Sequence, residues 1–321
     1  MLIGEGGYIM IDVSIIIVSY NSIDEILLNI QSLKENITSL SYEIIIVNNY
    51  VKDCKISAAL KKYDNVTIIE PKSNLGFGKA NNLGLEQAKG KYILFVNPDV
   101  IFLTDINPLT DILETDPQIG LIGPVTYNGD GKILPSCGEY PAIKNFLSYH
   151  FFLNHLFPRI KWWGNLPMKY FDFKDTREVD WISGAFMLGR KSTLKQIGGF
   201  DKDFFMYSED IDICWRLKKL GFKIIFSDKA NIIHNMGHSV KSKSITKAKL
   251  LVESNRILWG KHYNSKTVKK LFVILCLGSI IRKIGWQVLN LIRISKGKNM
   301  SIYYKMIISE SINCIKGEMG K

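Results

Sequence analysis

The stretch YILFVNPDV, from Tyr92 to Val100, constrains the fold of this 321-residue chain more than any other. It opens with an uninterrupted apolar run, Tyr92 to Val96, as in a parallel-sheet strand that is buried on both faces. Because Pro98 cannot donate a ladder hydrogen bond, we expect the strand to end with Asn97 and Asp99 at its carboxyl edge. Ligands of open α/β sheets bind at that edge, and such oxygen donors suit Mg²⁺ or Mn²⁺. An ordinary turn is the alternative, since these residue types also favour turns.

Strands and helices alternate along the first part of the chain. Apolar runs and helical spacing predict, in order, strand 13–20, a helix after Ser22, strand 43–47, helix 55–63, strand 66–70, a helix within 74–90, strand 92–96, helix 105–115 and strand 119–127. This alternation implies βαβ units and a mostly parallel sheet flanked by helices, which is an α/β fold. Ser22, with Glu25 three residues later, predicts a capping box at the first helix.

The segment NLGFGKANNLGLEQAKG, residues 74–90, places Gly76 and Gly78 at the start of a helix that we expect to end at Gly90. Backbone N–H groups at a helix start favour phosphate, and Lys79 adds positive charge. A G-x-G pattern alone completes neither a P-loop nor a Rossmann motif, so a glycine-softened connection is the alternative.

The middle of the chain is less regular. NGDG at 128–131 predicts a hairpin turn. Residues 133–178 lose periodicity and are rich in aromatic residues and proline, which is typical of a lid or binding loop, or else of a small satellite core. VDWISGAFMLG at 179–189 then predicts a strand that breaks at Ser183-Gly184.

Three acidic residues, Glu209, Asp210 and Asp212, follow Ser208 in the first turn of a predicted helix. Ser208 is a candidate N-cap, and the helix dipole stabilises acidic residues at this end. Three acids within four residues exceed what capping requires, so they are candidates for catalysis. His234 follows strands predicted at 223–226 and 231–233; a neutral His is a common metal ligand, although a lone His is often structural.

The net charge of +12 is unevenly distributed. Residues 1–240 carry 25 basic and 27 acidic side chains, whereas residues 241–321 carry 17 basic and 3 acidic ones. We therefore predict that the chain consists of two parts, divided near residue 240. The five cysteines include no C-x-x-C, which argues against a disulfide framework or a zinc site and for a reducing compartment. The N-terminus lacks the basic region of a secretory signal.

The basic C-terminal part is predicted to be helical. A helix is expected at 245–262, and the apolar run 271–281 is too short to span a bilayer. If the run continues as a helix to Ile294, six polar side chains lie within one arc of that helix: Ser279, Arg282, Lys283, Gln287, Asn290 and Arg293. Such a helix favours an anionic membrane surface. Packing on the first part of the chain and an oligomer contact are the alternatives, and nucleic acid is not expected because no recognised binding module accompanies the charge.

With these features in order, the chain resembles family 2 glycosyltransferases of the GT-A type, especially the bacterial rhamnosyltransferase-like group that builds surface polysaccharides. The resemblance runs from Asp12 to Ser239, and five segments carry it: VSIIIVSYNS, NLGFGKANNLGLEQAKGKYILFVNPDV, DWISGAFMLGR, FDKDFFMYSEDIDICWRLKKLG and IIHNMGHS. It implies a Rossmann-like GT-A catalytic domain at 1–240, with a nucleotide-sugar half at 12–127 and an acceptor half with the catalytic acids at 128–240. The basic amphipathic helical extension at 241–321 would follow, for membrane association.

The resemblance also implies roles for single residues. Asp99 would hold a divalent cation, Mg²⁺ or Mn²⁺, with His234 as a further ligand and Asn97 in place of a carboxylate. Asp210 would be the catalytic base, with Glu209 beside it. The remaining contacts would be Ser19, Tyr20, Asn21, Asn48, Asn49, Asn74, Gly76, Lys79, Asn82 and Asn97 to the nucleotide-sugar, and Trp181, Ser183 and Gly184 to the acceptor. Asn48 and Asn49 replace the family's usual acidic residue, which changes the hydrogen bonds open to a pyrimidine base.

The implied function is an inverting glycosyltransferase that moves rhamnose or a similar hexose from a dTDP- or UDP-sugar to a glycan or polyprenyl-linked acceptor. A carboxylate would take the proton of the acceptor hydroxyl, and a cation would neutralise the departing diphosphate. We expect a cytoplasmic enzyme, peripheral on the inner face of the cell membrane; a homo-oligomer is compatible with the sequence. A sugar nucleotidyltransferase and an inactive membrane-bound glycan-binding or scaffold protein are the alternatives.

Overall fold

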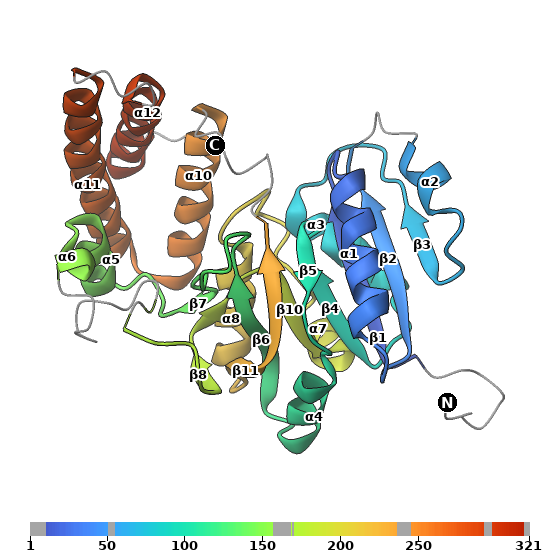
Figure 1. The fold of residues 1–321 in the computed structure, drawn as a ribbon. Helices are drawn as coiled ribbons and strands as arrows, with labels where there is room; N and C mark the ends of the chain where they lie inside the picture. Colours follow the sequence, from blue (N-terminus) through green and yellow to red (C-terminus); the bar gives the residue numbers. More distant parts are fainter. Residues whose placement is uncertain are drawn as a thin grey trace. The chain divides into compact units, whose positions relative to one another are not determined.

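The computed structural model describes residues 11–50, 55–156, 168, 170–235, 245–291 and 297–317. The chain forms two compact units (Figure 1). The first comprises Met1–Cys137, Phe173–Phe205 and Glu209–Met236, and the second comprises Gly138–Asp172, Met206–Ser208 and Gly237–Lys321. Residues 138–172 thus group with the C-terminal helices, and the functional division at residue 240 stays a prediction.

The first unit is built on a mixed sheet with the strand order β3-β2-β1-β4-β10-β6-β11-β5. Its N-terminal half is parallel: β1 pairs with β2 and β4, and β2 pairs with β3. The strands are β1 Val13–Ser19, β2 Tyr42–Asn48, β3 Val66–Ile69 and β4 Tyr92–Val96. Every residue of β4 is buried, which confirms that this apolar run is a strand covered on both faces.

The other half of the sheet runs in both directions. β10 is antiparallel to β4 and β6, β11 is parallel to β6, and β5 and β8 pair antiparallel with β11. The strands are β5 Val100–Phe102, β6 Ile119–Tyr127, β8 Arg177–Val179, β10 Phe186–Arg190 and β11 Lys223–His234; β7 (Cys137–Gly138) and β9 (Trp181–Ile182) lie outside this sheet. β5 is absent from the sequence-based prediction because three residues are too few to show a period.

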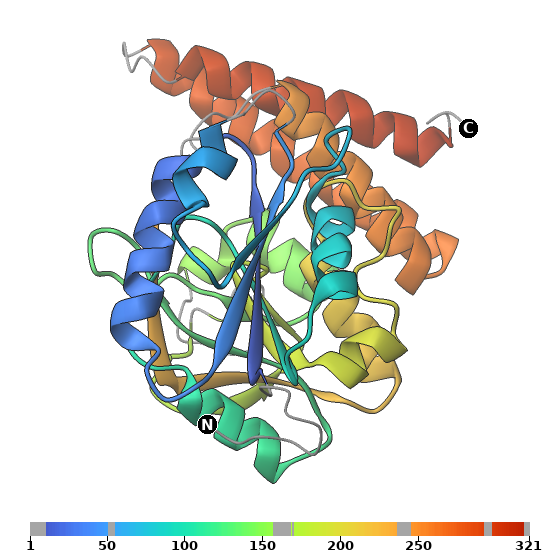
Figure 2. The same ribbon diagram turned by 90° about the vertical axis from the view of Figure 1, so that its right-hand side faces the viewer.

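Helices cover both faces of this sheet. They are α1 Ile23–Asn36, α2 Lys55–Leu60, α3 Phe77–Gln87, α4 Asn107–Thr115, α7 Lys191–Gln196 and α8 Glu209–Lys219. Ile15 of β1 shares a core cluster with Ile30 of α1, whereas a Cβ on Gly84 of α3 would collide with Ile16. Since alternate strand residues face opposite sides, α1 and α3 lie on opposite faces of the sheet, as Figure 2 shows.

The start of α1 differs from the prediction. Ser22 precedes the helix, but its hydroxyl makes no capping bond and lies 3.2 Å from the hydroxyl of Ser19 instead. The predicted capping box is therefore wrong, because the side chain turns back toward the end of β1. The apolar stripe of the same helix is confirmed, since Ile26, Ile30 and Leu33 are fully buried.

The described part of the second unit is helical, with α5 Ile143–His150, α6 Leu153–Leu156, α10 Ile245–His262, α11 Ser265–Leu291 and α12 Gly297–Lys316. Trp259 is fully buried, and its ring lies edge-on to those of Phe146 (5.1 Å between centroids) and Phe272 (4.7 Å). Part of the aromatic segment 133–178 therefore belongs to the core of this unit.

α11 turns part of its predicted polar arc inward. Arg282 donates hydrogen bonds to the backbone oxygens of His150 (2.9 Å) and Tyr149 (3.0 Å) at the end of α5, and Ser279 is 1% exposed. These two positions of the polar arc are therefore not available to a membrane surface, because Arg282 satisfies the last carbonyls of α5 and Ser279 is buried. What α11 leaves exposed is an aliphatic stripe of Val273, Leu277, Ile280, Ile281, Ile284 and Val288.

The length of α11 also changes the membrane argument. The apolar run counted from the sequence is short, but the helix continues on both sides of it, and Ser265–Leu289 is long and apolar enough to cross a membrane by length and composition alone. Within this helix, 33% of an 18-residue apolar stretch is buried inside the protein. Length therefore does not exclude a membrane span, and the inward contacts of Arg282 and Ser279 describe a helix packed on its own unit.

Candidate functional site

The carboxyl ends of β1, β2, β4 and β11 lie at one edge of the sheet. β10 is antiparallel to β4 and to β6, and β11 is parallel to β6, so β11 runs in the direction of β4. Ser19, Asn48, Asn97 and His234 stand at or directly after these strand ends. The neighbours of β1 are β2 on one side and β4 on the other, which makes this edge a topological switch point where ligands of open α/β sheets bind.

The turn between β4 and β5 brings the predicted metal ligands together. Nε2 of His234 lies 3.3 Å from Oδ1 of Asp99 and 3.4 Å from Nδ2 of Asn97. The side chains of Asp99 and His234 are 12% and 13% exposed, so a small ligand can reach both. The pairing of β5 with β11 produces this arrangement, because it sets Val100 opposite His234.

These side chains fit a cation that the substrate helps to hold. Within the described ranges, no cluster of three or more His, Cys, Asp or Glu side chains is arranged to bind a metal ion. Mg²⁺ in nucleotide enzymes usually takes one or two carboxylates together with phosphate oxygens and water. Asp99, with the Asn97 amide and the His234 imidazole beside it, offers an incomplete ligand set of this type.

The start of β10 connects this turn to the predicted catalytic base. The backbone N–H groups of Gly184 and Ile211 donate to Oδ2 (3.0 Å) and Oδ1 (2.9 Å) of Asp210. Ala185, the next residue after Gly184, accepts a hydrogen bond from the N–H of Asn97 at 3.0 Å. Asp210 and the Asn97 turn are therefore joined through two consecutive backbone groups at the same edge of the sheet.

Glu209 and Asp210 are adjacent carboxyl groups in different surroundings. Glu209 is 6% exposed, and its Oε2 has no hydrogen-bond partner among the described residues. Burial and then the neighbouring Asp210 charge raise the pKa of Glu209 to about 8. Burial also raises the pKa of Asp210, while its two backbone N–H bonds act in the opposite direction. The N–H groups of Gly184 and Ile211 favour the ionised form of Asp210, whereas burial and the Asp210 charge favour the protonated form of Glu209.

The third acid of this helix has a structural role. Asp212 is fully buried and accepts a 2.7 Å hydrogen bond from Nε of Arg216. Arg216 also donates to the backbone oxygens of Ile197 (3.0 Å) and Gly199 (2.7 Å). Through Arg216, Asp212 attaches α8 to the segment after α7. This structural role accounts for the third acidic residue in the first turn of α8.

The residues after β1 and β2 differ in how open they are to a nucleotide. Ser19 is fully buried and Asn48 is 4% exposed, with Oδ1 of Asn48 accepting the N–H of Tyr50 at 3.3 Å. Asn21 adopts a left-handed φ of 54°. Tyr20 is 55% exposed, and its ring lies edge-on to Tyr50 at 5.1 Å. Of these predicted contacts, Tyr20 and Asn21 are exposed, whereas Ser19 and Asn48 are buried.

Asn49 fixes the glycine-rich loop. Its Nδ2 donates to Oδ1 of Asn74 (2.9 Å) and to the backbone oxygen of Gly76 (3.0 Å), and its Oδ1 accepts the N–H of Leu75 (2.8 Å). Gly76 has a φ of 79°, and a Cβ there would overlap the carbonyl oxygen of Phe205. Both the conformation and the close approach require glycine at this position.

Two predicted residues of α3 have different environments. Lys79 is exposed, as a phosphate contact would be. Asn82 is 7% exposed, and its amide is occupied: Nδ2 donates to the carbonyl of Phe200 and Oδ1 accepts the N–H of Phe200, both at 2.8 Å. The contact of Asn82 with the nucleotide-sugar stays a prediction, whereas its structural role is evident.

The predicted acceptor residues directly precede β10. Trp181 and Ser183 are partly exposed, and Gly184 is buried. A Cβ on Gly184 would lie 3.4 Å from Cβ of Asp210 and 3.5 Å from the ring of Phe77, so the absent side chain leaves room beside the carboxylate. Phe77 is not among the predicted site residues. The sequence signal that could have identified it is its position directly after Gly76.

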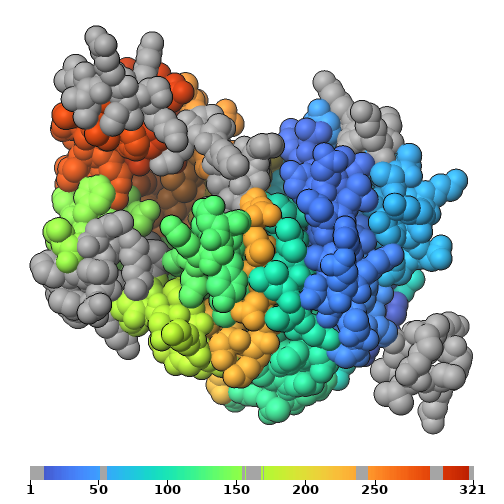
Figure 3. Space-filling model, viewed as in Figure 1, coloured from blue at the N-terminus to red at the C-terminus, as the bar shows by residue number. Residues whose placement is uncertain are grey.

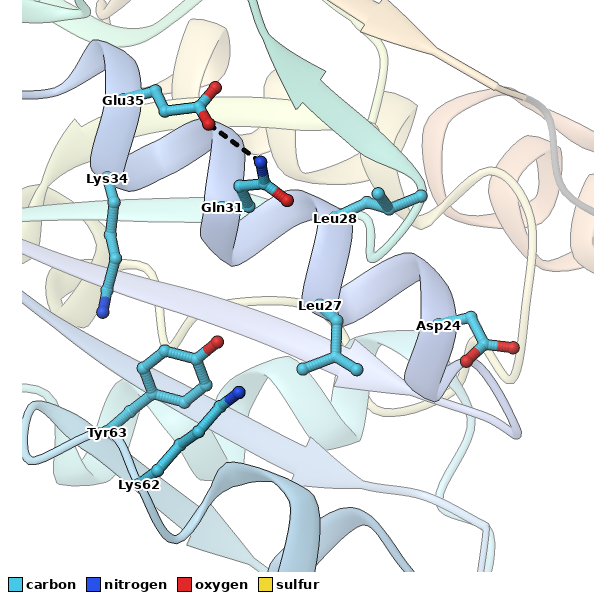
Figure 4. A pocket seen from close by; sticks show the side chains of 8 residues that line it. All are labelled: Asp24, Leu27, Leu28, Gln31, Lys34, Glu35, Lys62 and Tyr63. Atoms are coloured by element: carbon cyan, nitrogen blue, oxygen red, sulfur yellow. Dashed lines mark hydrogen bonds between the residues drawn. The ribbon is translucent and has the colours of Figure 1, made fainter.

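A surface hollow lies between α1 and residues 62–63. Figure 3 shows α1, in blue, on the face turned to the viewer. Figure 4 shows the side chains that line it: Asp24, Leu27, Leu28, Gln31, Lys34, Glu35, Lys62 and Tyr63. Nζ of Lys34 lies 4.3 Å from the centre of the Tyr63 ring. None of these residues is a predicted site residue.

Residues 14–198 match the family model described as glycosyl transferase family 2. The chain belongs to this family. Rhamnosyltransferase WbbL of Escherichia coli (strain K12) is 31% identical over 245 residues, which cover 72% of this chain and 86% of that protein. N-acetylglucosaminyl-diphospho-decaprenol L-rhamnosyltransferase of Mycobacterium tuberculosis (strain ATCC 25618 / H37Rv) is 29% identical over 214 residues, which cover 63% of this chain and 69% of that protein. This family 2 glycosyltransferase is therefore an enzyme of the rhamnosyltransferase-like group.

The solved structures give the same fold. Mannosyltransferase PcManGT from Pyrobaculum calidifontis, in complex with GDP-Man and Mn²⁺, matches with a TM-score of 0.54 and 14% identity, over 97% of this chain and 88% of that chain. The likeness confirms the predicted GT-A fold, with a mixed, mostly parallel central sheet flanked by helices.

Proposed function

We propose that this family 2 glycosyltransferase moves rhamnose or a similar hexose, with inversion, from a dTDP- or UDP-sugar to a glycan or polyprenyl-linked acceptor. The proposal is carried by the hydrogen bond from Gly184 to Asp210 at the sheet edge that also bears Asp99 and His234. The names of two relatives support the sugar, and one of them names a diphospho-decaprenol, which supports the lipid-linked acceptor.

Asp210 acts as the base in this proposal. Two backbone N–H groups fix its carboxylate, and the remaining lone pairs can accept a proton. As the acceptor oxygen forms its bond to the anomeric carbon, its proton passes to Asp210 and the bond to the diphosphate breaks, with its electron pair leaving on the diphosphate. Glu209 holds a proton and therefore adds no second negative charge next to the base.

Asp99, Asn97 and His234 would hold the divalent cation. When bound, the cation supplies positive charge to the diphosphate leaving group. The Mn²⁺ in the PcManGT complex supports a divalent cation for this fold in general. Nε2 of His234 and Oδ1 of Asp99 lie 3.3 Å apart, and the nucleotide-sugar phosphates would complete the coordination.

Thermal-shift measurements against dTDP-, UDP- and GDP-sugars, each with Mn²⁺ or Mg²⁺, test the donor. We expect stabilisation by one nucleotide-sugar that depends on the cation, metal-dependent hydrolysis of that donor without acceptor, and transfer to a polyprenyl-diphosphate glycan. Formation of a sugar nucleotide from an NTP would instead identify a nucleotidyltransferase. Glycan binding without hydrolysis or transfer would identify an inactive scaffold protein.

We further propose that α11 places the enzyme on an anionic membrane surface, at the inner face of the cell membrane. Its exposed aliphatic stripe begins at Val273, and the exposed Lys266 and Lys270 continue the same face of the helix toward its N-terminus. Residues 241–321 carry 17 basic and 3 acidic side chains, which attract anionic lipid. An aliphatic stripe with lysines at its end suits a helix that lies in the membrane interface.

Sedimentation with liposomes, either anionic or zwitterionic, tests the membrane proposal. We expect salt-sensitive binding to anionic liposomes that the double substitution Leu277→Glu with Ile284→Glu abolishes. Leu28→Glu, at an exposed leucine of α1, is the matched control and should bind as the wild type does. Unchanged binding of the double variant would contradict the proposal. A wild-type dimer that the double variant dissociates, without lipid binding, would assign the stripe to a second copy of the chain.

A further inference from the structure

α1 presents a polar stripe to the sheet beside its apolar stripe. Asn29, Ser32 and Asn36 are spaced three and four residues apart, so they lie on one face of the helix. Asn29 is fully buried and Ser32 is 4% exposed. Buried polar side chains are normally hydrogen-bonded, and the long-range partners of these three all lie in β5 or in the turn before it.

The stripe satisfies the outer edge of β5. Nδ2 of Asn29 donates to the oxygen of Val100 at 2.8 Å, the N–H of Phe102 donates to Oγ of Ser32 at 3.0 Å, and Nδ2 of Asn36 donates to the oxygen of Phe102 at 3.0 Å. β5 ends the strand order, with β11 on its other side, and alternate strand residues direct their N–H and C=O groups to the same edge. α1 thus takes the place of a neighbouring strand and covers this edge.

Asn29 also reaches the turn that carries Asp99. Its Nδ2 lies 3.3 Å from the oxygen of Asn97 as well as 2.8 Å from that of Val100. One amide group therefore bridges the two carbonyl oxygens on either side of Pro98 and Asp99. The NH₂ group of Asn29 makes both contacts. Its oxygen, Oδ1, is buried and has no hydrogen-bond partner in the part of the chain that the structure describes.

We propose that Asn29 is a positioning residue for the cation-binding turn and acts through Asp99; this inference rests on the proposed function. On its other side the turn is held by β11, where the N–H of Asn235 donates to the backbone oxygen of Asp99 at 3.1 Å. Without the Asn29 amide, the oxygen of Val100 loses this donor and the oxygen of Asn97 keeps only the N–H of Val100 at 3.3 Å, so the turn is fixed by backbone hydrogen bonds alone, to Ala185 before β10 and to Asn235 after β11. Groups that orient metal ligands typically contribute about ten- to a hundredfold to metal affinity.

Asn29→Asp is the sharpest test, because it keeps the shape of the side chain and removes both donors. The probe is Mn²⁺ with UDP or dTDP, and the readout is free Mn²⁺ measured by electron paramagnetic resonance, which does not depend on turnover. We expect Mn²⁺ binding to weaken by about tenfold or more in Asn29→Asp. A smaller loss is expected in Asn29→Ser, whose hydroxyl can still donate one bond.

Asn36→Asp is the matched control, since it removes the same type of bond to β5 without touching the turn. It should bind Mn²⁺ as the wild type does, and nucleotide binding without metal should be unchanged in every variant. Wild-type Mn²⁺ affinity in both Asn29 variants would overturn the inference and leave the proposed function standing. A wild type that binds no Mn²⁺ with either nucleotide would overturn both. If Asn29→Asp does not fold, the comparison of Asn29→Ser with Asn36→Ser decides in the same way.

Discussion

The backbone N–H of Gly184 donates a 3.0 Å hydrogen bond to Oδ2 of Asp210. Gly184 precedes β10 and Asp210 lies in the first turn of α8, so the contact joins two segments of one sheet edge. Burial raises the pKa of the Asp210 carboxyl, and this N–H stabilises its ionised form. A partly exposed carboxylate of raised basicity, with backbone donors that favour its ionised form, is suited to take a proton from an acceptor hydroxyl.

Asp210→Asn should remove sugar transfer and retain nucleotide binding. The amide keeps the size of the side chain but cannot accept a proton, and loss of a general base typically slows a reaction by about 10²- to 10⁴-fold. Initial rates with the donor identified by thermal shift, together with the dissociation constant of its nucleoside diphosphate, measure both effects.

The control for this variant is Asp64→Asn, which changes an exposed aspartate of the same unit without altering the sheet edge. It should transfer sugar at the wild-type rate. Wild-type turnover in Asp210→Asn would show that Asp210 is not the base.

Gly184→Ala should impair the acceptor step while the fold is preserved. The new methyl group would make ordinary van der Waals contacts, 3.4 Å from Cβ and 3.6 Å from Oδ2 of Asp210, and the backbone N–H would remain. It would nevertheless fill space next to the base. We expect kcat/KM for the acceptor to fall by about tenfold or more, because small displacements of reacting groups are costly. The dissociation constant of the donor and the melting temperature should change little; a large loss of stability with normal kinetics would contradict this explanation.

The sequence indicates well the strand end and the helix start that carry the predicted site residues, because these signals are local. The apolar run before Asn97 predicts β4, the proline predicts its end, and the acids before the apolar stripe of α8 mark Asp210. What it does not show is which face of a helix meets which partner. Helical spacing groups Ser279 with Arg282 but cannot tell that α5 offers carbonyl oxygens to Arg282.

Asn29 illustrates the same limit. It stands beside the apolar stripe of α1, at helical spacing from Ser32, so a polar stripe can be read from the sequence. Its partners, the oxygens of Asn97 and Val100, lie about 70 residues further along the chain. Periodicity carries no information about such long-range hydrogen bonds, and β5 itself is too short to be predicted.

The stability of the protein should depend on the proton held by Glu209. The pKa of Glu209 is about 8 in the folded protein against 4.5 ordinarily, so the folded state binds this proton more tightly than the unfolded state. The resulting stabilisation is complete below pH 4.5 and declines as the pH rises toward 8. The slope is at most about 1.4 kcal/mol per pH unit.

Glu209→Gln has no such proton, so its free energy of unfolding should rise relative to that of the wild type between pH 5 and pH 8. Urea denaturation at several pH values measures this difference. Glu86→Gln, at an exposed glutamate of α3, is the control and should follow the wild-type profile. Parallel profiles for the wild type and Glu209→Gln would contradict the assignment of the proton to Glu209.

Asn82 and Lys79 lie on the same helix and should respond in opposite ways to alanine substitution. Asn82→Ala leaves the buried N–H and C=O of Phe200 without their partners, which should lower the free energy of unfolding by about 1–3 kcal/mol per lost partner and leave the donor KM unchanged. Lys79 is exposed, so Lys79→Ala should keep the wild-type stability and raise the KM of the nucleotide-sugar. Urea denaturation and donor kinetics on both variants separate the two effects. If Asn82→Ala instead raises the KM and keeps the wild-type stability, Asn82 is a ligand of the nucleotide-sugar. Its hydrogen bonds to Phe200 would then contribute nothing to the stability of the fold.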